Sequence, residues 1–183
     1  MLLPPLTSRR LGANTDLVRQ WLYDHAGILH RDLSLGNIMY RIIEGQVHGV
    51  LTDYDLSSWK AALTAYDAKS SEEATGTTPY MTQELLKGIS PAHLYRHDVE
   101  SLFYVMLTMC GCRAICRTRG VDGEGELQVV VGKGKLPYQS WFEGRGYVLG
   151  CIRGTFLYHR GDIELSLSFE GFRVWLNDPQ WLF

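Results

Sequence analysis

Residues 29–37 read Leu-His-Arg-Asp-Leu-Ser-Leu-Gly-Asn, a stretch that mixes polar and charged residues with leucines. Its aspartate, Asp32, and its asparagine, Asn37, are residue types that favour loops, because their side chains hydrogen-bond the nearby backbone. Two apolar runs with β-branched residues, 38–43 and 46–52, follow this stretch and are separated by a Glu-Gly pair. The pattern predicts a polar loop that leads directly into a β-hairpin.

Helical segments are expected before and after this hairpin. In residues 15–25 the apolar side chains recur at helical spacing, and Gly27 follows as a residue suited to end a helix. Residues 99–109 are apolar almost all the way round, which is typical of a helix buried inside a domain. Residues 57–79 are polar and show no sustained period, so we expect a long loop there with about one helical turn.

The remainder of the chain carries weaker signals. Residues 120–134 are rich in glycine, which predicts a boundary or an insertion, and 127–131 are expected to form an exposed strand. Further along, a set of aromatic residues that begins with Trp141 is expected to anchor a small additional core. Several glycines in the same region make its helices weak by propensity.

Composition limits the classes of function. The 183 residues are 45% hydrophobic and 21% charged, with a net charge of -2, and this near-neutral balance argues against a nucleic-acid binder. The longest apolar run, 102–112, is too short to cross a bilayer core of roughly 30 Å. No basic segment precedes the apolar residues at the start of the chain, and the four cysteines are expected to be reduced thiols. We therefore expect an intracellular protein, cytoplasmic or nuclear, with no membrane or nucleic-acid partner.

Four short motifs follow one another along the chain: His30-Arg31-Asp32 with Asn37, then Asp53-Tyr54-Asp55, then Gly76-Thr77-Thr78-Pro79-Tyr80-Met81 leading to Glu84, and finally Asp98. A single tripeptide arises often by chance, whereas four motifs in this order are specific. From residue 16 to about residue 110, the sequence resembles the C-terminal lobe of a protein kinase. Residues 29–34, 53–56 and 97–104 resemble the fungal-type protein kinase family in particular.

This resemblance implies a fold and a division of the chain. The expected class is α+β, a kinase-like C-lobe that is mainly helical, with a small β-hairpin at the catalytic loop and no N-lobe sheet. The expected parts are an irregular segment at 1–13, the lobe core at 14–117, a glycine-rich insertion at 118–135 and a divergent helical part at 136–183.

The chemistry expected from the resemblance is phosphoryl transfer from ATP to a serine or threonine hydroxyl of a protein. Such a reaction needs an aligned nucleophile and cations that neutralise the charge on the phosphates. The Asp32 carboxylate would accept or orient the hydroxyl proton of the substrate. The side-chain oxygens of Asn37 and Asp53 are hard ligands suited to Mg²⁺. We expect the side chains of these three residues to meet in one pocket.

Other residues of the motifs are expected to have structural or regulatory roles. His30 and Arg31 would be structural or regulatory, and Asp98 would hydrogen-bond the backbone of the catalytic loop and hold its strained shape. Arg31 would receive a phosphate placed on one of the following hydroxyls: Ser70, Ser71, Thr75, Thr77 or Thr78. Glu84 would form an ion pair with an arginine, for which the candidates are Arg153, Arg160 and Arg173.

The sequence also departs from a complete kinase. Five strands and a helix of a kinase N-lobe need upwards of ~55 residues, yet 29 residues precede His30. We therefore expect negligible kinase activity from these residues alone, doubtful binding of ATP and Mg²⁺, and a protein partner over the missing N-lobe face. Ser34 and Asp55 stand where many protein kinases have a lysine and a glycine, although serine at the first position is usual in the fungal-type family.

Alternative interpretations stay open. A small-molecule phosphotransferase of the aminoglycoside or choline kinase type also uses an aspartate and an asparagine, although the 76–84 segment argues against it. A non-catalytic, pseudokinase-like binding module or a truncated remnant is a second alternative. Purely structural roles are also possible for the site residues: Asp32 and Asn37 as turn residues, Asp53 as a strand-end residue, and Asp98 as a helix N-cap.

Overall fold

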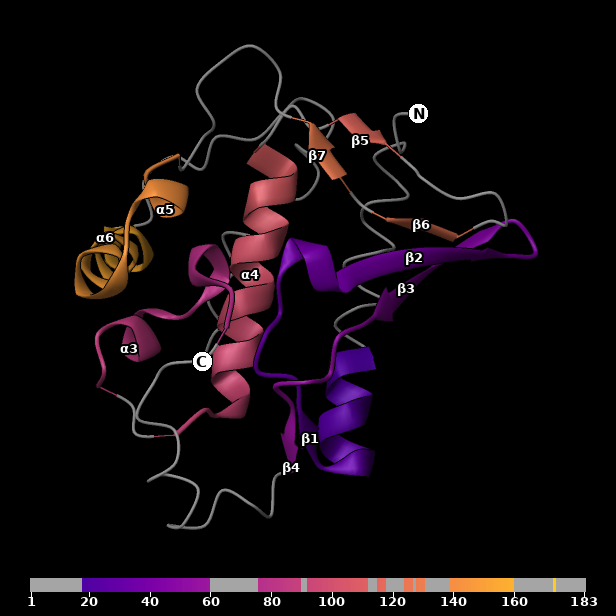
Figure 1. Ribbon diagram of the computed structural model, residues 1–183, viewed down its shortest axis with the longest axis horizontal. Helices are drawn as coiled ribbons and strands as arrows, with labels where there is room; N and C mark the ends of the chain where they lie inside the picture. The colour runs from indigo at the N-terminus through magenta and orange to yellow at the C-terminus, as the bar shows by residue number, and fades with distance from the viewer. Residues whose placement is uncertain are drawn as a thin grey trace.

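The computed structural model describes residues 18–59, 76–89, 92–111, 115–117, 124–126, 128–130, 139–159 and 173. Its centre is the helix α4 (Tyr95–Gly111), with the hairpin of β2 (Ile38–Ile43) and β3 (Gln46–Leu51) on one side (Figure 1). On the other side lie α3 (Gln83–Leu86), α5 (Gln139–Glu143) and α6 (Gly146–His159). The protein is thus α+β, with mixed helix and small antiparallel sheets, as the sequence predicts.

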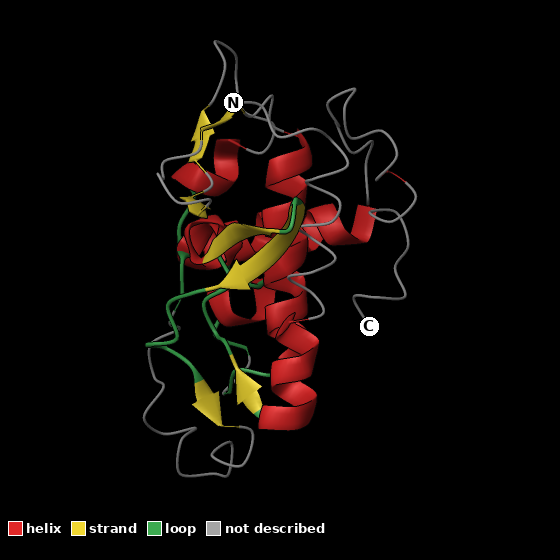
Figure 2. Ribbon diagram, turned by 90° about the vertical axis from the view of Figure 1, so that its right-hand side faces the viewer, coloured by secondary structure: helices red, strands yellow, loops and turns green. Residues whose placement is uncertain are grey.

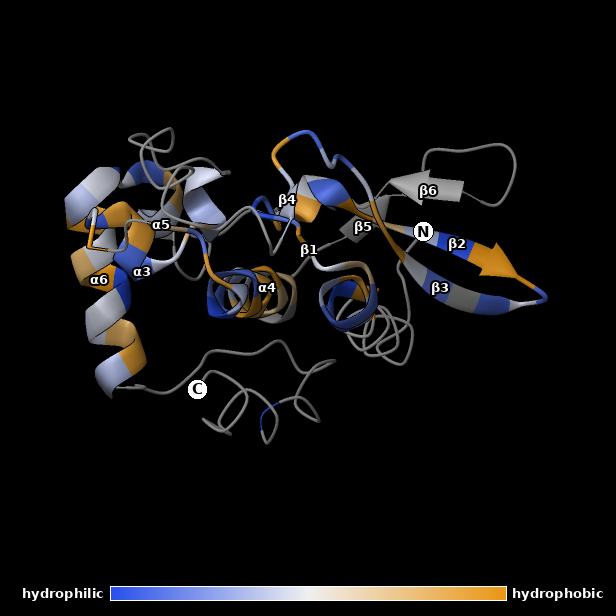
Figure 3. Ribbon diagram, turned by 90° about the horizontal axis from the view of Figure 1, so that it is seen from below, coloured by the Kyte–Doolittle hydropathy of each residue, from blue (hydrophilic) through white to orange (hydrophobic). Residues whose placement is uncertain are grey.

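The N-terminal helix is confirmed where it is described. Residues 18–21 are helical and continue into a π-helical turn, η1 (Leu22–Ala26). The helix ends at Gly27, whose φ of 65° is in the left-handed region, and the N–H of Gly27 donates to the carbonyl of Leu22. Residues 15–17 of the predicted helix lie outside the described residues. This helix lies beside α4 (Figure 3). It leads toward the polar loop that contains Asp32 and Asn37, which we call the site loop.

The predicted hairpin is also present. β2 and β3 pair antiparallel from Ile38 opposite Leu51 to Ile43 opposite Gln46, so the strand ends one residue before its expected limit. A third strand, β6 (Glu124–Glu126), pairs with the other edge of β2, which the sequence did not predict. Figure 2, which looks at the hairpin side, shows these strands in front of the helices.

Two further pairs of strands are short. β1 (Ile28–Leu29) pairs with β4 (Ser58–Trp59). Of these two strands, β4 falls within the segment at 57–79 that the sequence predicts to be a loop. β5 (Ile115–Arg117) pairs with β7 (Gln128–Val130), and β7 falls within the predicted strand at 127–131. Residues 60–75, which make up most of the predicted loop, lie outside the described residues.

The core is built around α4, whose residues 101–109 are all buried. This confirms the predicted buried helix, which begins four residues earlier than expected, at Tyr95. Trp141 is 2% exposed and its ring contacts the Tyr104 ring at 5.2 Å between centroids. Trp141 and Leu149 belong to the same cluster of buried residues as α4, so the expectation of a separate small core is wrong for this part of the chain.

Glycine allows α6 to approach α3 closely. A Cβ atom on Gly150 would lie 2.8 Å from Cγ of Lys87 and 3.1 Å from the carbonyl oxygen of Gln83. The loss of helix propensity at this glycine is therefore offset by packing that a larger residue would prevent. Among the described helices, none has both the length and the apolar character that crossing a membrane requires.

Candidate active site

Asp98 holds the backbone of the loop at 30–32. It lies in the first turn of α4 and is 1% exposed. Its Oδ2 accepts a hydrogen bond from the backbone N–H of His30 (2.8 Å), and its Oδ1 accepts one from that of Arg31 (3.1 Å). Arg31 has a φ of 69°, a conformation that costs on the order of 1–3 kcal/mol and persists only where the surroundings impose it. The buried carboxylate supplies that constraint, and this is the contact expected from the sequence.

His93 completes the surroundings of this carboxylate. The residue is buried, and its Nε2 donates to Oδ1 of Asp98 at 2.8 Å. Burial raises the pKa of Asp98, but the hydrogen bond and charge of His93 and the N–H of His30 outweigh it, so the pKa is lowered. Asp98 is therefore ionised at neutral pH. His93 belongs to none of the four sequence motifs, so its role as a support for Asp98 becomes visible only in the structure.

Asp32 is held by two different segments. Its Oδ1 accepts the backbone N–H of Thr77 (2.6 Å) and the Thr77 hydroxyl (2.8 Å). Its Oδ2 accepts a hydrogen bond from Nδ2 of Asn37 (3.1 Å), which also donates to the Asp32 carbonyl (2.9 Å). The structure therefore brings together Asp32, Asn37 and Thr77, three of the residues singled out from the sequence.

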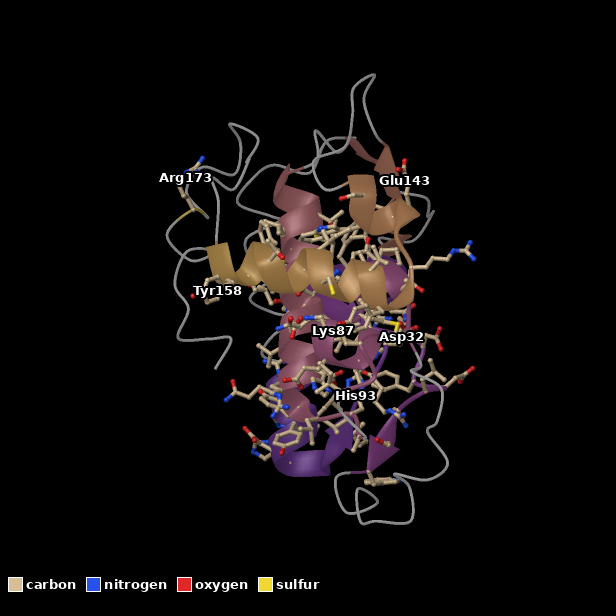
Figure 4. All side chains as sticks on the ribbon, turned by 90° about the vertical axis from the view of Figure 1, so that its left-hand side faces the viewer. Asp32, Lys87, His93, Glu143, Tyr158 and Arg173 are labelled. Atoms are coloured by element: carbon tan, nitrogen blue, oxygen red, sulfur yellow. The ribbon has the colours of Figure 1, made fainter. Side chains whose placement is uncertain are left out.

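Gly76 permits this approach of the two segments. Its φ is 132°, and a Cβ atom there would lie 3.3 Å from both the Arg31 carbonyl oxygen and Cγ of Met81. Asp32 and His93 line the same hollow (Figure 4), which leaves no room for a water-sized group. The inner side of Asp32 is thus closely packed.

Asp53 lies next to this group without touching it. The hairpin brings Thr52 to Asn37, whose carbonyl accepts the Thr52 N–H (3.0 Å) and hydroxyl (3.3 Å). Asp53 follows directly, exposed and with a φ of 62°. Within the described residues its carboxylate has no hydrogen bond or ion pair, and the Asn37 Oδ1 atom has no hydrogen-bond donor. Of the three side chains expected to meet, those of Asp32 and Asn37 are in direct contact. Asp53 is near them only because the preceding residue, Thr52, hydrogen-bonds the Asn37 carbonyl.

His30 joins the loop to the segment that carries Asp53. Its buried ring donates from Nε2 to the Thr52 carbonyl (3.0 Å), since Nδ1 is on the side of the Asp32 N–H (3.4 Å). The ring also lies 4.9 Å from the Tyr54 ring, between centroids. The loop at 30–32 is therefore held against the residues that directly follow β3.

The partner of Glu84 differs from the arginines considered in the sequence. Its Oε2 accepts from Arg96 at 2.7 Å and from His97 Nε2 at 3.0 Å, and both partners lie on α4. The hydrogen bonds from Arg96 and His97 lower the pKa of Glu84. Burial lowers the pKa of His97, and its Nδ1 accepts the N–H of Leu94 (3.0 Å), so His97 is a neutral donor.

Arg153, a candidate for that ion pair, has another position. It is fully buried and donates to the carbonyl oxygen of Pro79, with its guanidinium 4.1 Å from the Tyr104 ring centre and 5.2 Å from that of Trp141. Burial lowers the pKa of Arg153 to about 10, so it stays charged at neutral pH. Among the described residues, Glu84 accepts its side-chain hydrogen bonds from Arg96 and His97, so Arg173 is not its partner there.

Several of the sequence-predicted residues cannot be compared with the structure. Arg160 and the hydroxyls of Ser70, Ser71 and Thr75 lie outside the described residues. Thr77 is described, and its hydroxyl is engaged by Asp32. No cluster of three histidine, cysteine or acidic side chains suited to a metal occurs within the described segments.

An aspartate and an asparagine on one loop, joined through a hairpin to a second aspartate, define a kinase-like class of site. The chain belongs to the fungal protein kinase family, because the model of that family, described as "Fungal protein kinase", matches residues 15–110, more than half of the 183 residues. No curated protein matches the chain. The family assignment agrees with the resemblance seen in the sequence.

Proposed function

We propose that this chain forms the C-terminal lobe of a protein kinase, whose site transfers phosphate from ATP to a serine or threonine of a protein. The observation that supports the proposal is that the Asp32 carboxylate accepts hydrogen bonds from two segments. Asn37 donates from its own loop, and Thr77 donates from the 76–84 segment. A carboxylate fixed from two sides has one orientation, and an oriented carboxylate is what a general base needs.

Asp32 would accept or orient the proton of the substrate hydroxyl. Its carboxylate is half-buried, and Asp98 fixes the backbone that carries it. The Thr77 contact also favours a protein kinase over a small-molecule phosphotransferase. It brings the 76–84 segment, which the sequence associates with protein substrates, directly to the base.

Asn37 and Asp53 fit a role in holding Mg²⁺. Because Asn37 directs both its amide hydrogen bonds at Asp32, its Oδ1 is left as an acceptor among the described residues. The Asp53 carboxylate is exposed one residue beyond the Asn37 contact. Mg²⁺ takes one or two protein oxygens and completes its shell with water and phosphate oxygens, which neutralises charge on the transferring group.

The outward face beside Asp53 is the proposed position of a protein partner. Tyr54 is 38% exposed and Leu56 is 37% exposed, although both are apolar in large part. A partner that covered these side chains would also close the nucleotide side of the site. We accordingly expect the chain without such a partner to bind Mg·ATP weakly and to transfer phosphate slowly.

The test is a thermal-shift titration of the chain with ATP and Mg²⁺, because a ligand that binds the folded state raises its melting temperature. Because weak binding still shifts the equilibrium when the ligand concentration is comparable to its dissociation constant, we expect a small rise in Tm at millimolar nucleotide with the unchanged chain and none with Asp53→Asn. Asp24→Asn removes the same charge from the exposed surface of η1 and should retain the rise. No rise at millimolar nucleotide in the unchanged chain would instead support a non-catalytic binding module.

A further inference from the structure

The peptide group between Pro79 and Tyr80 is held at both of its polar ends. Its carbonyl oxygen, that of Pro79, accepts a hydrogen bond from the guanidinium of Arg153 on α6. Its N–H, that of Tyr80, donates to the carbonyl oxygen of Thr77 at 2.8 Å. Because a peptide group is planar, holding both polar ends fixes the orientation of the whole group. We call it the 79–80 peptide.

Thr77 connects this peptide to the candidate base. Its backbone N–H and its hydroxyl both donate to Oδ1 of Asp32, at 2.6 Å and 2.8 Å. A continuous series of hydrogen bonds therefore begins at Arg153 on α6 and ends at Asp32 in the site loop. The hydrogen bonds of such a series polarise and strengthen one another in a buried setting.

The guanidinium of Arg153 is itself fixed by its surroundings. The side chain is fully buried, and its guanidinium carbon lies 4.1 Å from the Tyr104 ring centre and 5.2 Å from that of Trp141. Both distances are within the range of attraction between a cation and an aromatic ring. The donor that Arg153 directs at the Pro79 carbonyl is therefore held in one place.

Glu100 anchors the other end of the same segment. Its Oε1 accepts the backbone N–H of Gln83 at 3.0 Å and the Tyr104 hydroxyl at 2.6 Å. Tyr104 thus contacts two charged groups, since its ring lies against Arg153 and its hydroxyl donates to Glu100. Residues 79–83 are held at one end by α6 and at the other by α4.

Stability alone does not account for this arrangement. The Nε and Nη1 atoms of Arg153 are buried without a hydrogen-bond acceptor in the part of the chain that the structure describes. Replacing buried charges by uncharged residues of similar volume is often neutral or stabilising. A buried arginine that directs one donor at a single carbonyl is therefore better suited to orienting that peptide than to stabilising the fold.

We propose that Arg153 is a positioning residue for Asp32. It acts through the 79–80 peptide, whose N–H holds the Thr77 carbonyl. Without Arg153 this peptide is free to rotate, and Thr77 loses its fixed relation to Asp32. The role of Asp32 as a general base rests on the proposed function, whereas the coupling between Arg153 and Thr77 does not.

The test is amide hydrogen exchange, followed by NMR at two N–H groups of the site. The Thr77 N–H donates to Asp32, and the Thr52 N–H, which donates to the Asn37 carbonyl, is the reference. Arg153→Met should speed exchange at Thr77 about tenfold more than at Thr52, because it removes a charged donor from the 79–80 peptide. Arg153→Lys retains a charged donor and should retain part of the protection at Thr77.

Leu149→Ala is the matched control. Leu149 is buried on the same helix and belongs to the same core, but it makes no contact in the hydrogen-bonded series. This variant should lower stability and speed exchange at both amides by a similar factor. Equal factors with Arg153→Met would show a merely structural role and would overturn the proposal.

A second variant covers the case in which Arg153→Met does not fold. The charge of Arg153 counters that of the buried Glu100, so its removal alone leaves a buried carboxylate unpaired. Arg153→Met combined with Glu100→Gln removes both charges and keeps an acceptor oxygen for Tyr104. The same selective effect on Thr77 is expected, and equal factors at the two amides would again contradict the proposal.

The outcomes separate this proposal from the proposed function. A selective effect on Thr77 together with no Tm rise by Mg·ATP would keep the coupling and reject the kinase function. A Tm rise together with equal effects on Thr77 and Thr52 would keep the function and reject the coupling.

Discussion

The inner and outer sides of the site loop differ in how they are held. On the inner side, Asp98 accepts hydrogen bonds from the loop backbone and from His93, all in a buried setting. On the outer side, Asp53 and the neighbouring Tyr54 are exposed. Asp98 on α4 and the neighbouring His93 hold the backbone of the loop, while the part that would meet a nucleotide contributes little to stability. Changes on the two sides should therefore have very different effects.

The largest loss of stability is expected from Asp98→Ala. The change leaves buried N–H groups and the His93 ring without their acceptor, which costs about 3–5 kcal/mol for a broken buried charge pair. Urea unfolding monitored by circular dichroism measures the loss. Asp24→Ala, at an exposed position, should change the free energy of unfolding by less than about 0.5 kcal/mol. Similar losses in the two variants would refute the inner-side account.

Acid should weaken the contacts that α4 makes with the site loop and with the 76–84 segment. The unfolded chain binds a proton more readily than the folded chain at His97, Glu84 and Asp98, because the pKa of each is lowered by folding. Stability should first fall as pH drops through about 6.5, and fall again below about 5 as the carboxylates are protonated. Glu100 opposes this trend, since burial raises its pKa.

The histidine part of this pH dependence can be separated from the rest. His97→Gln should flatten the dependence of the free energy of unfolding near pH 6.5, measured by urea titration at a series of pH values. His25→Gln, at an exposed position on η1, should leave that dependence unchanged. A curve that is flat from pH 7 to pH 5 in the unchanged chain would contradict the prediction.

An intermediate effect is expected where the two segments meet. Gly76→Ala adds a Cβ 3.3 Å from the Arg31 carbonyl oxygen at a φ of 132°, so we expect a loss of about 1–3 kcal/mol. Gly88→Ala is the matched control, because its φ is 66° and its Cβ would meet nothing within 4 Å. Denaturant unfolding should show the larger loss for Gly76→Ala, and the reverse order would show that the close approach is unimportant.

The smallest effect is expected on the outer side. Asp53→Asn keeps a residue type that tolerates a φ of 62° and removes no described hydrogen bond, so stability should change by less than about 0.5 kcal/mol. The same urea measurement checks this. A loss comparable to that of Asp98→Ala would mean that both sides of the loop hold the fold.

Local signals in the sequence predicted most of the elements that place the site. The hairpin strands and the buried helix α4 follow from side-chain periodicity, and Gly27 ends the first helix as expected. The contact of Asp98 with the loop is the one that the resemblance to protein kinases implied. The Glu84 partner could not be found in this way. Arg96, which is only 12 residues away, was not among the predicted candidates, because the motif does not indicate which arginine packs against Glu84.

Other features depend on contacts between distant segments. The pairing of β6 with β2 joins residues that are more than 80 positions apart, and neither strand encodes it by its own pattern. The sequence likewise did not reveal the role of Gly150. Helix propensity predicts only that a glycine destabilises α6, whereas the structure shows that the missing Cβ lets α6 pack closely on α3.

By itself, the sequence determined the membership of a kinase family, the loop with Asp32 and Asn37, the hairpin and the buried helix, because periodicity and motif spacing act over short stretches of chain. The tertiary structure decided that Arg96 binds Glu84 and that Arg153 donates to the Pro79 carbonyl. It also decided that His93 supports Asp98 and that a groove lies beside Thr78. These features arise only when α3, α4 and α6 pack together, since side chains distant in sequence become neighbours through that packing.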